Sequence, residues 1–236
     1  MKLQTVLRQC GLQPSKMDKE LWLKFDDRSP QKLLALITIH VDDLKMAGEP
    51  HVIMQIQQTL QKEFGELKIA WCSFVNCGVR HIQDENTKEV TLDQLEFVRS
   101  LCPIVDSALT GRDEVLCEPA LHSQYRSLLG ALAYAVHTRP DLSVFVVSLQ
   151  RGSAKPNLGQ VKRLNSVLQW TQRNPKVLKY IQIDNKPSEL VVVSDAAFKR
   201  ETDDGYSLRG AAFSEERRGP IPGPIWAKGL SPQCTC

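Results

Sequence analysis

The sequence lacks any long apolar run, and this argues against a membrane-spanning helix. No stretch approaches the roughly 18 consecutive apolar residues that such a helix needs. The first residues, MKLQTVLRQCGLQPSK, also lack the apolar segment of a secretory signal. Seven cysteines, an odd number, are scattered without the spacing of a disulfide framework. We therefore expect an intracellular protein of the cytoplasm or nucleus, with reduced thiols and no membrane partner.

The chain also lacks a strong overall charge, but one segment lacks acids altogether. With 42% hydrophobic and 24% charged residues among 236, the composition suits a globular protein of one large or two small domains. The net charge is only +3. From position 151 to 179, however, there are seven basic residues and no acidic one: Arg151, Lys155, Lys162, Arg163, Arg173, Lys176 and Lys179. Such a segment can follow the phosphates of a nucleic acid, and the alternative is a solvated helix face.

Cys72, Cys77 and His81 have a spacing loosely like that of a zinc knuckle. If WCSFVNCGVRHI forms one strand, residues five apart point to opposite faces and cannot meet at one metal ion. We therefore do not expect zinc at these positions.

Hydrophobic periodicity predicts a mixed α+β chain. After a short N-terminal helix, LLALITIH and LKMAG are the two β-rich arms of a hairpin joined at VDD. The segment 51–64 places Val52, Ile56, Leu60 and Phe64 four residues apart, which predicts a helix that packs on a sheet. IAWCSFVNCGVRHI and EVTLDQL, separated by DENTK, predict a second hairpin that leads into a helix through Arg99.

The second half begins with a loop after Pro103 and then becomes helical. Helices are predicted at 125–136, at 141–151 with Asp141 as a candidate cap, and at 158–174 with Asn157 as the cap. For 141–151 a strand is the alternative, because Val144, Val146 and Val147 also suit one. From Leu178 the pattern changes to strands, at LKYIQI, ELVVVSDAAF, SLRGAAFS and PIWAK, which predicts the start of a separate α/β domain. Because no helix follows to cover that sheet, we expect the domain to be incomplete.

Two adjacent aspartates, Asp42 and Asp43, lie between the arms of the first hairpin. In a straight strand neighbouring side chains point to opposite faces, but at a tight turn both carboxylates can lie near one surface. Magnesium in proteins is commonly held by one or two carboxylates plus substrate phosphates, and a pair of such ions can drive nucleotidyl transfer. The alternative is that both aspartates are solvated turn residues without a task.

Several motifs occur in a fixed order along the chain. HVDDLKMAG is followed by FGELKIAWCSFVNCGVRHI and VTLDQLEFVRSL, then by EPALHSQYRSLLGALAYAVHTRPDLSVFVVSLQR, and last by LVVVSDAAF and DGYSLRG. With these motifs, over nearly its whole length, the sequence resembles the reverse transcriptase and adjoining ribonuclease H region of copia-type LTR retrotransposon Pol polyproteins. The block with YRSLLGALAY and TRPD is the most specific part, because it needs many residue types at fixed spacing.

The resemblance implies an α+β fold in three parts. Residues 1–102 would be the C-terminal part of a reverse transcriptase palm, with β-hairpins packed on helices, and the start of the thumb. Residues 103–176 would be a linker and a helical thumb or connection region. Residues 177–236 would be the first antiparallel strands of a truncated ribonuclease H-like domain. The implied activity is that of an RNA-directed DNA polymerase, a nucleotidyltransferase, from an element that spreads by DNA integration.

The resemblance also implies roles for single residues. Asp42 and Asp43 would be the catalytic, metal-binding carboxylates of the palm, with Mg²⁺ or Mn²⁺ as cofactor. Asp195 would be the first catalytic and metal-binding carboxylate of the ribonuclease H site, although a strand-end cap is the alternative. The residues expected to contact RNA, DNA or an RNA–DNA hybrid are Lys155, Lys162, Arg163, Arg173 and Lys176. Gly205 and Tyr206 match a Gly-Tyr pair of the family, but a turn glycine and a core aromatic explain them better.

The chain departs from the family pattern in three ways. The family has a further palm aspartate and the nucleotide-binding fingers upstream of the hairpin. Its ribonuclease H site needs several acids, of which only Asp195 is matched. His40 replaces the family's tyrosine beside the aspartates, and we expect it to be buried and structural. We therefore expect a fragment that does not polymerise alone, with the missing N-terminal polyprotein segment as a candidate partner. The alternatives are a non-catalytic nucleic-acid-binding remnant and a marginally folded product of a decayed gene.

Overall fold

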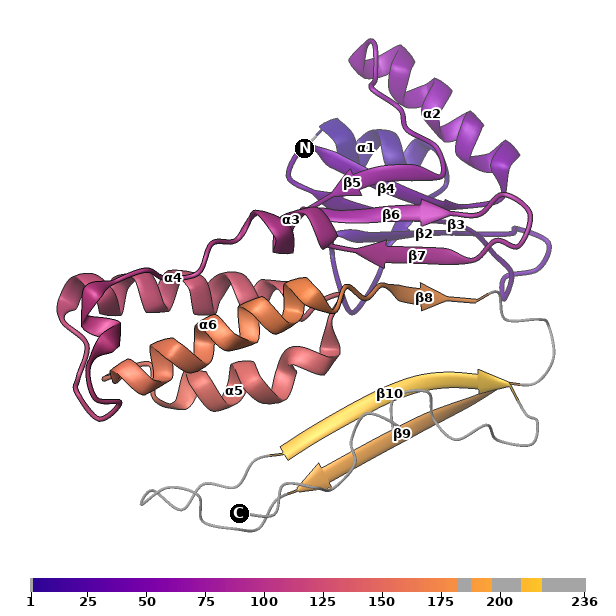
Figure 1. Ribbon diagram of the computed structural model, residues 1–236. Helices are drawn as coiled ribbons and strands as arrows, with labels where there is room; N and C mark the ends of the chain where they lie inside the picture. The colour runs from indigo at the N-terminus through magenta and orange to yellow at the C-terminus, as the bar shows by residue number, and fades with distance from the viewer. Residues whose placement is uncertain (1, 182–187, 197–208, 218–236) are drawn as a thin grey trace. The chain divides into compact units, whose positions relative to one another are not determined.

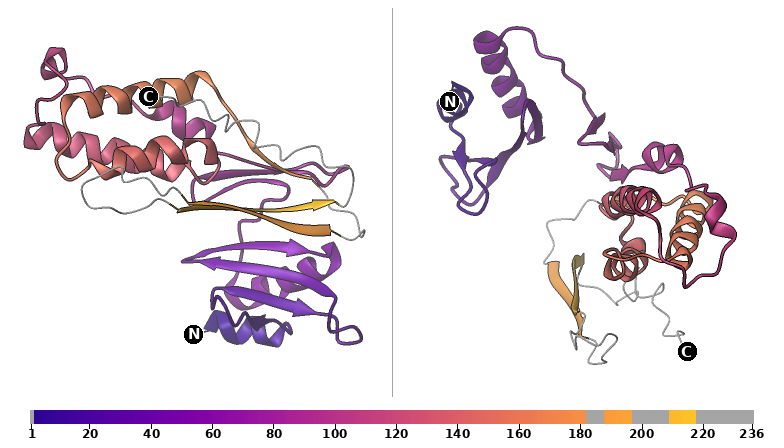
Figure 2. Two further views of the ribbon diagram at one scale, coloured as in Figure 1. Left: turned by 90° about the horizontal axis from the view of Figure 1, so that it is seen from below. Right: turned by 90° about the vertical axis from the view of Figure 1, so that its left-hand side faces the viewer.

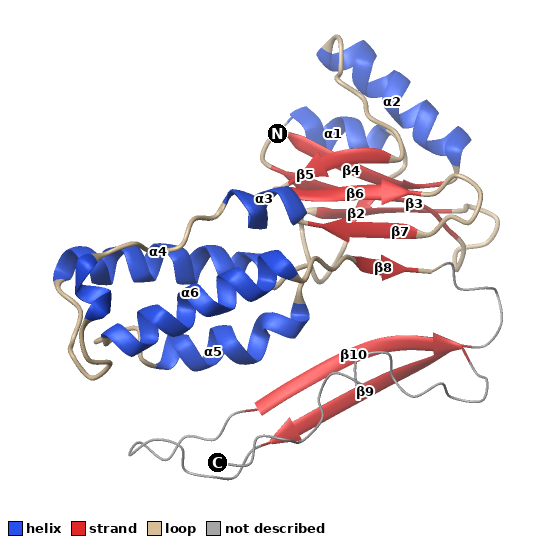
Figure 3. Cartoon of the chain, viewed as in Figure 1, coloured by secondary structure: helices blue, strands red, loops and turns tan. Residues whose placement is uncertain are grey.

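The structure is a computed structural model that describes residues 2–181, 188–196 and 209–217 (Figure 1). The chain divides into two compact units, Met1–Ile82 and Gln83–Cys236. Both units contain helices and antiparallel strands (Figure 3), so the α+β class predicted from the sequence is confirmed. The domain boundaries predicted at 102/103 and 176/177 stay predictions.

The unit Met1–Ile82 is built around an antiparallel sheet with the strand order β1-β2-β3-β4. The elements of this sheet and its helices are α1 (Lys2–Gln9), β1 (Gln13–Pro14), β2 (Leu21–Phe25), β3 (Leu33–His40), β4 (Asp43–Gly48) and α2 (Pro50–Phe64). Ala35 and Ile37 of β3 are buried while the residues after each are partly exposed, which is the period of a strand with one face in the core. α1 and α2 pack around Trp22 on that face and so cover it.

α2 lies where the four-residue spacing predicted a helix. Pro50 stands in its first turn, where the missing N–H has no intrahelical partner to lose, and Gly65 ends it with a φ of 88°. Val52, Ile56 and Leu60 are buried as predicted. Phe64, the fourth residue of the predicted stripe, is instead exposed, because it lies in the last turn, where the Lys2 ammonium is 5.1 Å from its ring.

The hairpin predicted around VDD is confirmed. β3 and β4 pair from Ala35↔Gly48 to His40↔Asp43, which leaves Val41 and Asp42 as a two-residue turn. Val41 has a φ of 54°, a conformation that β-branched residues rarely adopt. Because φ is positive at the first turn residue only, the turn is of the II′ kind, which favours glycine at that position. The backbone is therefore strained at the residue that precedes both aspartates.

The segment 73–83 forms a hairpin between two neighbouring strands of a four-stranded sheet. β5 (Ser73–Asn76) pairs antiparallel with β6 (Val79–Gln83), and Cys77 and Gly78 form the turn. Their φ angles of 48° and 68° are those of a type I′ turn. The premise of one straight strand, from which we argued against zinc, is therefore wrong.

The described elements of the unit Gln83–Cys236 begin with β7 (Val90–Asp93), α3 (Leu95–Ser100), the 3₁₀ helix η1 (Ser107–Thr110) and α4 (Pro119–Ala135). They continue with the 3₁₀ helix η2 (Pro140–Leu142), α5 (Ser143–Arg151), α6 (Leu158–Arg173), β8 (Leu178–Tyr180), β9 (Ser188–Ala196) and β10 (Arg209–Arg217). α4, α5 and α6 lie side by side and are seen nearly end-on in the right-hand view of Figure 2. The helices predicted at 125–136, 141–151 and 158–174 are confirmed, but α4 begins six residues before its predicted start, and the other ends differ by at most two residues.

The three long helices share one apolar core. The fully buried Tyr125 of α4 donates its hydroxyl to the Leu149 carbonyl of α5, at 2.8 Å. Asn157 caps α6 as predicted, and Gln160 completes a capping box with it. The prediction that Asp141 caps α5 is wrong: Leu142 holds the cap position, because the Asp141 carboxylate is bound to Arg139 instead.

Two pairs of strands complete the described part of this unit. β8 pairs antiparallel with β7, through Val90↔Tyr180, so the LKYIQI strand does not belong to the β9–β10 ladder as the sequence suggested. β9 and β10 pair antiparallel along their whole length, as expected for ELVVVSDAAF and SLRGAAFS. The strand predicted at PIWAK and the pair Gly205–Tyr206 lie outside the described residues.

Replacing Val41 with glycine should raise the free energy of unfolding of Met1–Ile82 by about 1 kcal/mol, because glycine adopts a φ near 54° without strain. Amide hydrogen exchange of β3 and β4 in the full chain measures the change. Val75→Gly is the matched control, since Val75 is also exposed but lies inside β5, where glycine should cost about 0.5–1 kcal/mol. If both substitutions destabilise the unit equally, Val41 is not strained.

Candidate functional site

The two adjacent aspartates lie at the tip of the β3–β4 hairpin. Asp42 is the second residue of the turn, and Asp43 is the first residue of β4, opposite His40. Both side chains are exposed. The hairpin turn that the sequence predicted for this pair is therefore present, while binding of one metal ion by both carboxylates stays a prediction.

Asp43 lies on the face of the sheet that α1 and α2 leave uncovered. Residues directly opposite each other in an antiparallel ladder point to the same side, as do residues two apart in a strand. The pairs His40↔Asp43 and Thr38↔Lys45 therefore share one face, and the buried Ile37 lies on the other. His40 is exposed, so the expectation that it is buried was wrong, because it is the last residue of β3 and lies beyond the core.

Lys45 forms a contact that the sequence did not reveal. Its ammonium donates to Nε2 of His81 at 2.9 Å, and the Nδ1–H of His81 donates to the Val79 carbonyl at 2.9 Å. Phe74 stacks on the His81 ring, with centroids 4.9 Å apart. Burial, together with the positive charge of Lys45, lowers the pKa of His81, against the opposing effect of the Val79 hydrogen bond. His81 is therefore neutral and accepts a hydrogen bond from Lys45. Lys45 lies two residues after Asp43 in β4.

The described residues contain no group of three or more His, Cys, Asp or Glu side chains placed to hold a metal ion. Within the described residues, Cys72, Cys77 and His81 therefore do not form such a group, and neither do the residues at the hairpin tip. Asp42 and Asp43 thus offer two carboxylates from the protein. Such a pair fits Mg²⁺, which usually keeps several waters and takes its remaining ligands from substrate phosphates.

The basic residues predicted to bind nucleic acid fall into two groups. Lys162 donates to the Gly111 carbonyl at 2.9 Å and to Asp113 at 2.7 Å, and Lys176 lies 3.1 Å from Asp141. Lys155, Arg163 and Arg173 are exposed and form no ion pair within the described residues. The second group is available to an anionic partner without first breaking an ion pair.

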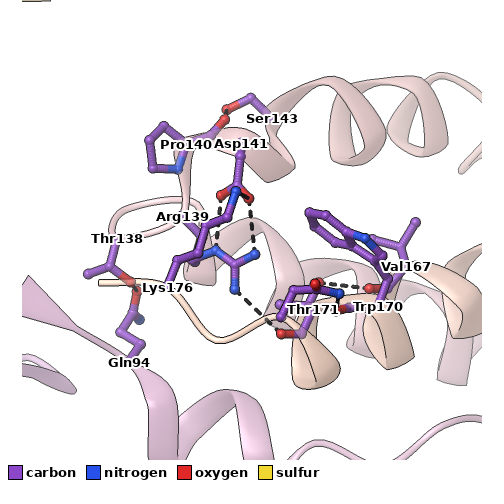
Figure 4. A network of polar contacts seen from close by, with 11 residues as sticks. Gln94, Thr138, Arg139, Pro140, Asp141, Ser143, Val167, Trp170, Thr171 and Lys176 are labelled. Carbon is purple, nitrogen blue, oxygen red and sulfur yellow. Dashed lines mark hydrogen bonds and ion pairs between the residues drawn. The ribbon is translucent and has the colours of Figure 1, made fainter. Parts of the chain in front are cut away.

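The TRPD motif is the centre of a polar network in the unit Gln83–Cys236 (Figure 4). Arg139 is only 3% exposed, and its Nε and NH2 atoms donate to the two carboxylate oxygens of Asp141 at 2.9 and 3.0 Å. Its NH1 atom points to the Thr171 carbonyl at 3.5 Å, near the end of α6. The indole of Trp170 covers the guanidinium, whose central carbon lies 5.7 Å from the ring centroid. From the sequence, TRPD was predicted to interrupt a helix and was part of the family motif. Its contacts could not be predicted.

The charge of Asp141 depends on these contacts. Burial by itself would raise the pKa of Asp141, but the hydrogen bonds and positive charges of Arg139 and Lys176 outweigh it and lower the pKa below 3.8. The carboxylate is therefore ionised at neutral pH and balances the buried guanidinium.

Beside this network, the Thr138 hydroxyl donates to Gln94 Oε1 at 3.0 Å, whereas the buried Nε2 of Gln94 has no hydrogen-bond partner among the described residues. The adjoining cavity measures about 10 Å³. Because ligand pockets usually exceed about 300 Å³, we assign this cavity no role in binding an organic ligand.

Asp195, the residue expected to belong to a ribonuclease H site, lies on β9. The backbone register places it opposite Gly210 of β10. Asp195 and the pair Asp42–Asp43 belong to different units, and each is a separate candidate site.

No family model, curated protein or solved structure matches this chain. Among the residues that the structure describes, no helix is both long enough and apolar enough to cross a membrane. The motifs and geometry of the chain itself are therefore what bears on its function.

Replacing Asp141 with asparagine should lower the free energy of unfolding by about 3 kcal/mol at neutral pH, because the buried guanidinium loses its charge partner. Urea unfolding measures this loss. Asp113→Asn is the matched control, since it removes the exposed Lys162 pair and should cost less than about 1 kcal/mol.

The difference in free energy of unfolding between the natural chain and Asp141→Asn should depend on pH. Because folding lowers the pKa of Asp141, its stabilisation is complete above the unfolded pKa near 3.8 and is lost as the pH falls through the folded value. The gap between the natural chain and Asp141→Asn should therefore narrow below about pH 4. A gap that stays constant down to about pH 2, or that equals the gap of Asp113→Asn, would contradict this assignment.

Proposed function

We propose that the chain is a piece of a copia-type retrotransposon reverse transcriptase that runs into a ribonuclease H-like region. Its ancestral reaction would be RNA-directed DNA synthesis. The observation that carries the proposal is the β3–β4 hairpin, which exposes Asp42 and Asp43 at its two-residue turn. The same turn places a strained valine directly before the two aspartates, and such strain is often found at functional sites.

The arrangement of the first unit supports a palm. Its sheet is covered by α1 and α2 on the face of Ile37, and the exposed Asp43 lies on the other face, at the end of the hairpin. In a nucleotidyl transfer, the primer hydroxyl attacks the α-phosphate of the incoming nucleotide, a new oxygen–phosphorus bond forms and pyrophosphate leaves. Mg²⁺ or Mn²⁺, when bound, would favour ionisation of the hydroxyl and neutralise phosphate charge. The role of Asp42 and Asp43 would be to hold the ions at the exposed tip of the hairpin, where a primer end could reach them.

The second unit supports the other two parts of the proposal. α4, α5 and α6 fit a helical thumb or connection region. The antiparallel pair β9–β10 fits the first two strands of a ribonuclease H-like sheet, and Asp195 on β9 would be its first metal-binding carboxylate. RNA, DNA or an RNA–DNA hybrid would be the partner. The proposal involves no membrane.

A second candidate function is that of a nucleic-acid-binding remnant without catalysis. The observation in its favour is that Lys155, Arg163 and Arg173 are exposed and unpaired within the described residues. These side chains could contact phosphates of an A-form hybrid by shape and charge, whatever the state of the hairpin.

Binding of Mn²⁺ should broaden the NMR signals of residues 40–45 in the full chain, and the double variant Asp42→Asn/Asp43→Asn should abolish the effect. The chain offers a matched control, because Asp26 and Asp27 are a second adjacent pair in the same unit. Equal broadening at Asp26–Asp27 would mean that any two neighbouring acids suffice, and the proposed metal site would be refuted.

In a primer-extension assay with Mg²⁺ or Mn²⁺, the chain alone should give no template-dependent product. The reason is that the described residues bring two carboxylates to the hairpin tip, and a two-metal site needs further ligands. Extension that Asp42→Asn abolishes would overturn this expectation and identify the chain as a working polymerase.

Binding to an RNA–DNA hybrid should weaken steeply as salt rises, because phosphate contacts release counterions. The double variant Arg163→Glu/Arg173→Glu should flatten the slope of log K against log salt by about one for each phosphate that is no longer neutralised. Lys16→Glu/Lys19→Glu, at exposed positions of the first unit, is the control. If the slope is the same in both variants, the basic segment is only a solvated helix face.

A further inference from the structure

An aromatic pair lies half-exposed where α5 and α6 meet. Phe145 is 45% exposed and Trp170 is 40% exposed, with ring centroids 6.1 Å apart and planes tilted by 53°. The next residue of α5, Val146, is buried in the helical core, so the Phe145 ring lies at the edge of that core and partly in solvent. Two large aromatic rings left this open offer flat apolar surface to a partner.

Basic side chains share this side of α6 with Trp170. The Lys176 ammonium lies 5.8 Å from the Trp170 ring centroid. Arg163, Trp170 and Arg173 are exposed and lie seven and three residues apart on α6, so they share one helix face. From position 151 to 179 no acidic residue interrupts this face. The nearby carboxylate of Asp141 is bound to Arg139 and Lys176 (Figure 4).

A purely structural role accounts for only part of this surface. Trp170 shields the buried guanidinium of Arg139, which explains one side of its indole. That role requires neither the exposed ring of Phe145 nor the unpaired charges of Arg163 and Arg173. Aromatic rings set among unpaired cations are the combination by which proteins bind nucleic acid strands without reading their sequence.

We propose that this aromatic–basic surface, made of Phe145, Trp170, Arg163 and Arg173, binds single-stranded nucleic acid. Bases would stack on the two rings, and the phosphates between them would contact the arginines. A duplex hides the faces of its bases, so stacking selects an unpaired strand. The inference rests on the nucleic-acid partner proposed above and is independent of Asp42 and Asp43.

Fluorescence anisotropy with labelled single strands of about 12 nucleotides, as DNA and as RNA, tests the proposal on the full chain. Phe145→Leu should weaken binding about tenfold, whereas Phe145→Tyr should keep it, because tyrosine retains a ring for stacking. Phe145 is the first choice because the Arg139 guanidinium is bound by Asp141 and covered by Trp170, and both of these residues remain in the variant. Trp71→Leu, at a 53% exposed tryptophan of the other unit, is the matched control and should bind like the natural chain.

A second measurement does not depend on how a variant folds. Photo-crosslinking of the natural chain to a strand that carries iodouracil, followed by mass spectrometry, should label Phe145 or Trp170. Crosslinks found only elsewhere, or Phe145→Leu binding as tightly as the natural chain, would overturn the proposal.

An RNA–DNA hybrid of the same length separates this inference from the proposed function. Tighter binding of the single strand, with sensitivity to Phe145→Leu only there, supports the inference. If the hybrid binds and depends on Arg163 and Arg173 while the single strand does not bind, the stacking surface is refuted and the proposed hybrid contact stands. If neither the single strand nor the hybrid binds, the stacking surface and the proposed hybrid contact are both refuted.

Discussion

One buried ion pair organises the helical part of this protein. Arg139 lies almost wholly out of solvent, and Asp141 meets it with both carboxylate oxygens. The guanidinium reaches the end of α6 at Thr171, and Lys176 approaches the same carboxylate from beyond α6. A buried charge is costly unless it is paired. A different arrangement of η2 relative to the end of α6 would break these contacts, so the ion pair constrains how the two elements pack.

The same network determines which basic residues remain available. Lys176 is drawn to Asp141 and Lys162 to Asp113, so two of the charges that looked like a nucleic-acid footprint stabilise the fold. Arg163 and Arg173 are left exposed on the face of α6 that also carries Trp170, whose indole covers Arg139. A structural contact thus places an aromatic ring beside unpaired cations, which is the basis of the proposed stacking surface.

In the first unit the corresponding constraint is the register of β3 and β4. Pairing of His40 with Asp43 leaves only two residues for the turn and forces a positive φ on Val41. A slip of one residue would move Ile37 out of the core, so the hydrophobic face fixes the turn and the turn fixes the position of the aspartates. The strain at Val41 is offset by burial elsewhere in the sheet.

Local periodicity was enough to predict most of the elements. The stripe of Val52, Ile56 and Leu60, the Asn157 cap and the arms around VDD each concern neighbours in the chain, and burial of one face leaves a regular pattern in such neighbours. The turn at Cys77 and Gly78 was missed although glycine favours such turns, because a single glycine within an apolar run also fits one continuous strand. The LKYIQI strand was assigned to the wrong ladder, because strand partners far apart in the sequence leave no local trace. The exposure of His40, the Lys45–His81 contact and the Arg139–Asp141–Lys176 network were decided by tertiary structure alone. The sequence by itself therefore determined which residues could be helix, strand or turn. Packing decided which charges are paired and which are left exposed, because pairing depends on distances in space that spacing along the chain does not encode.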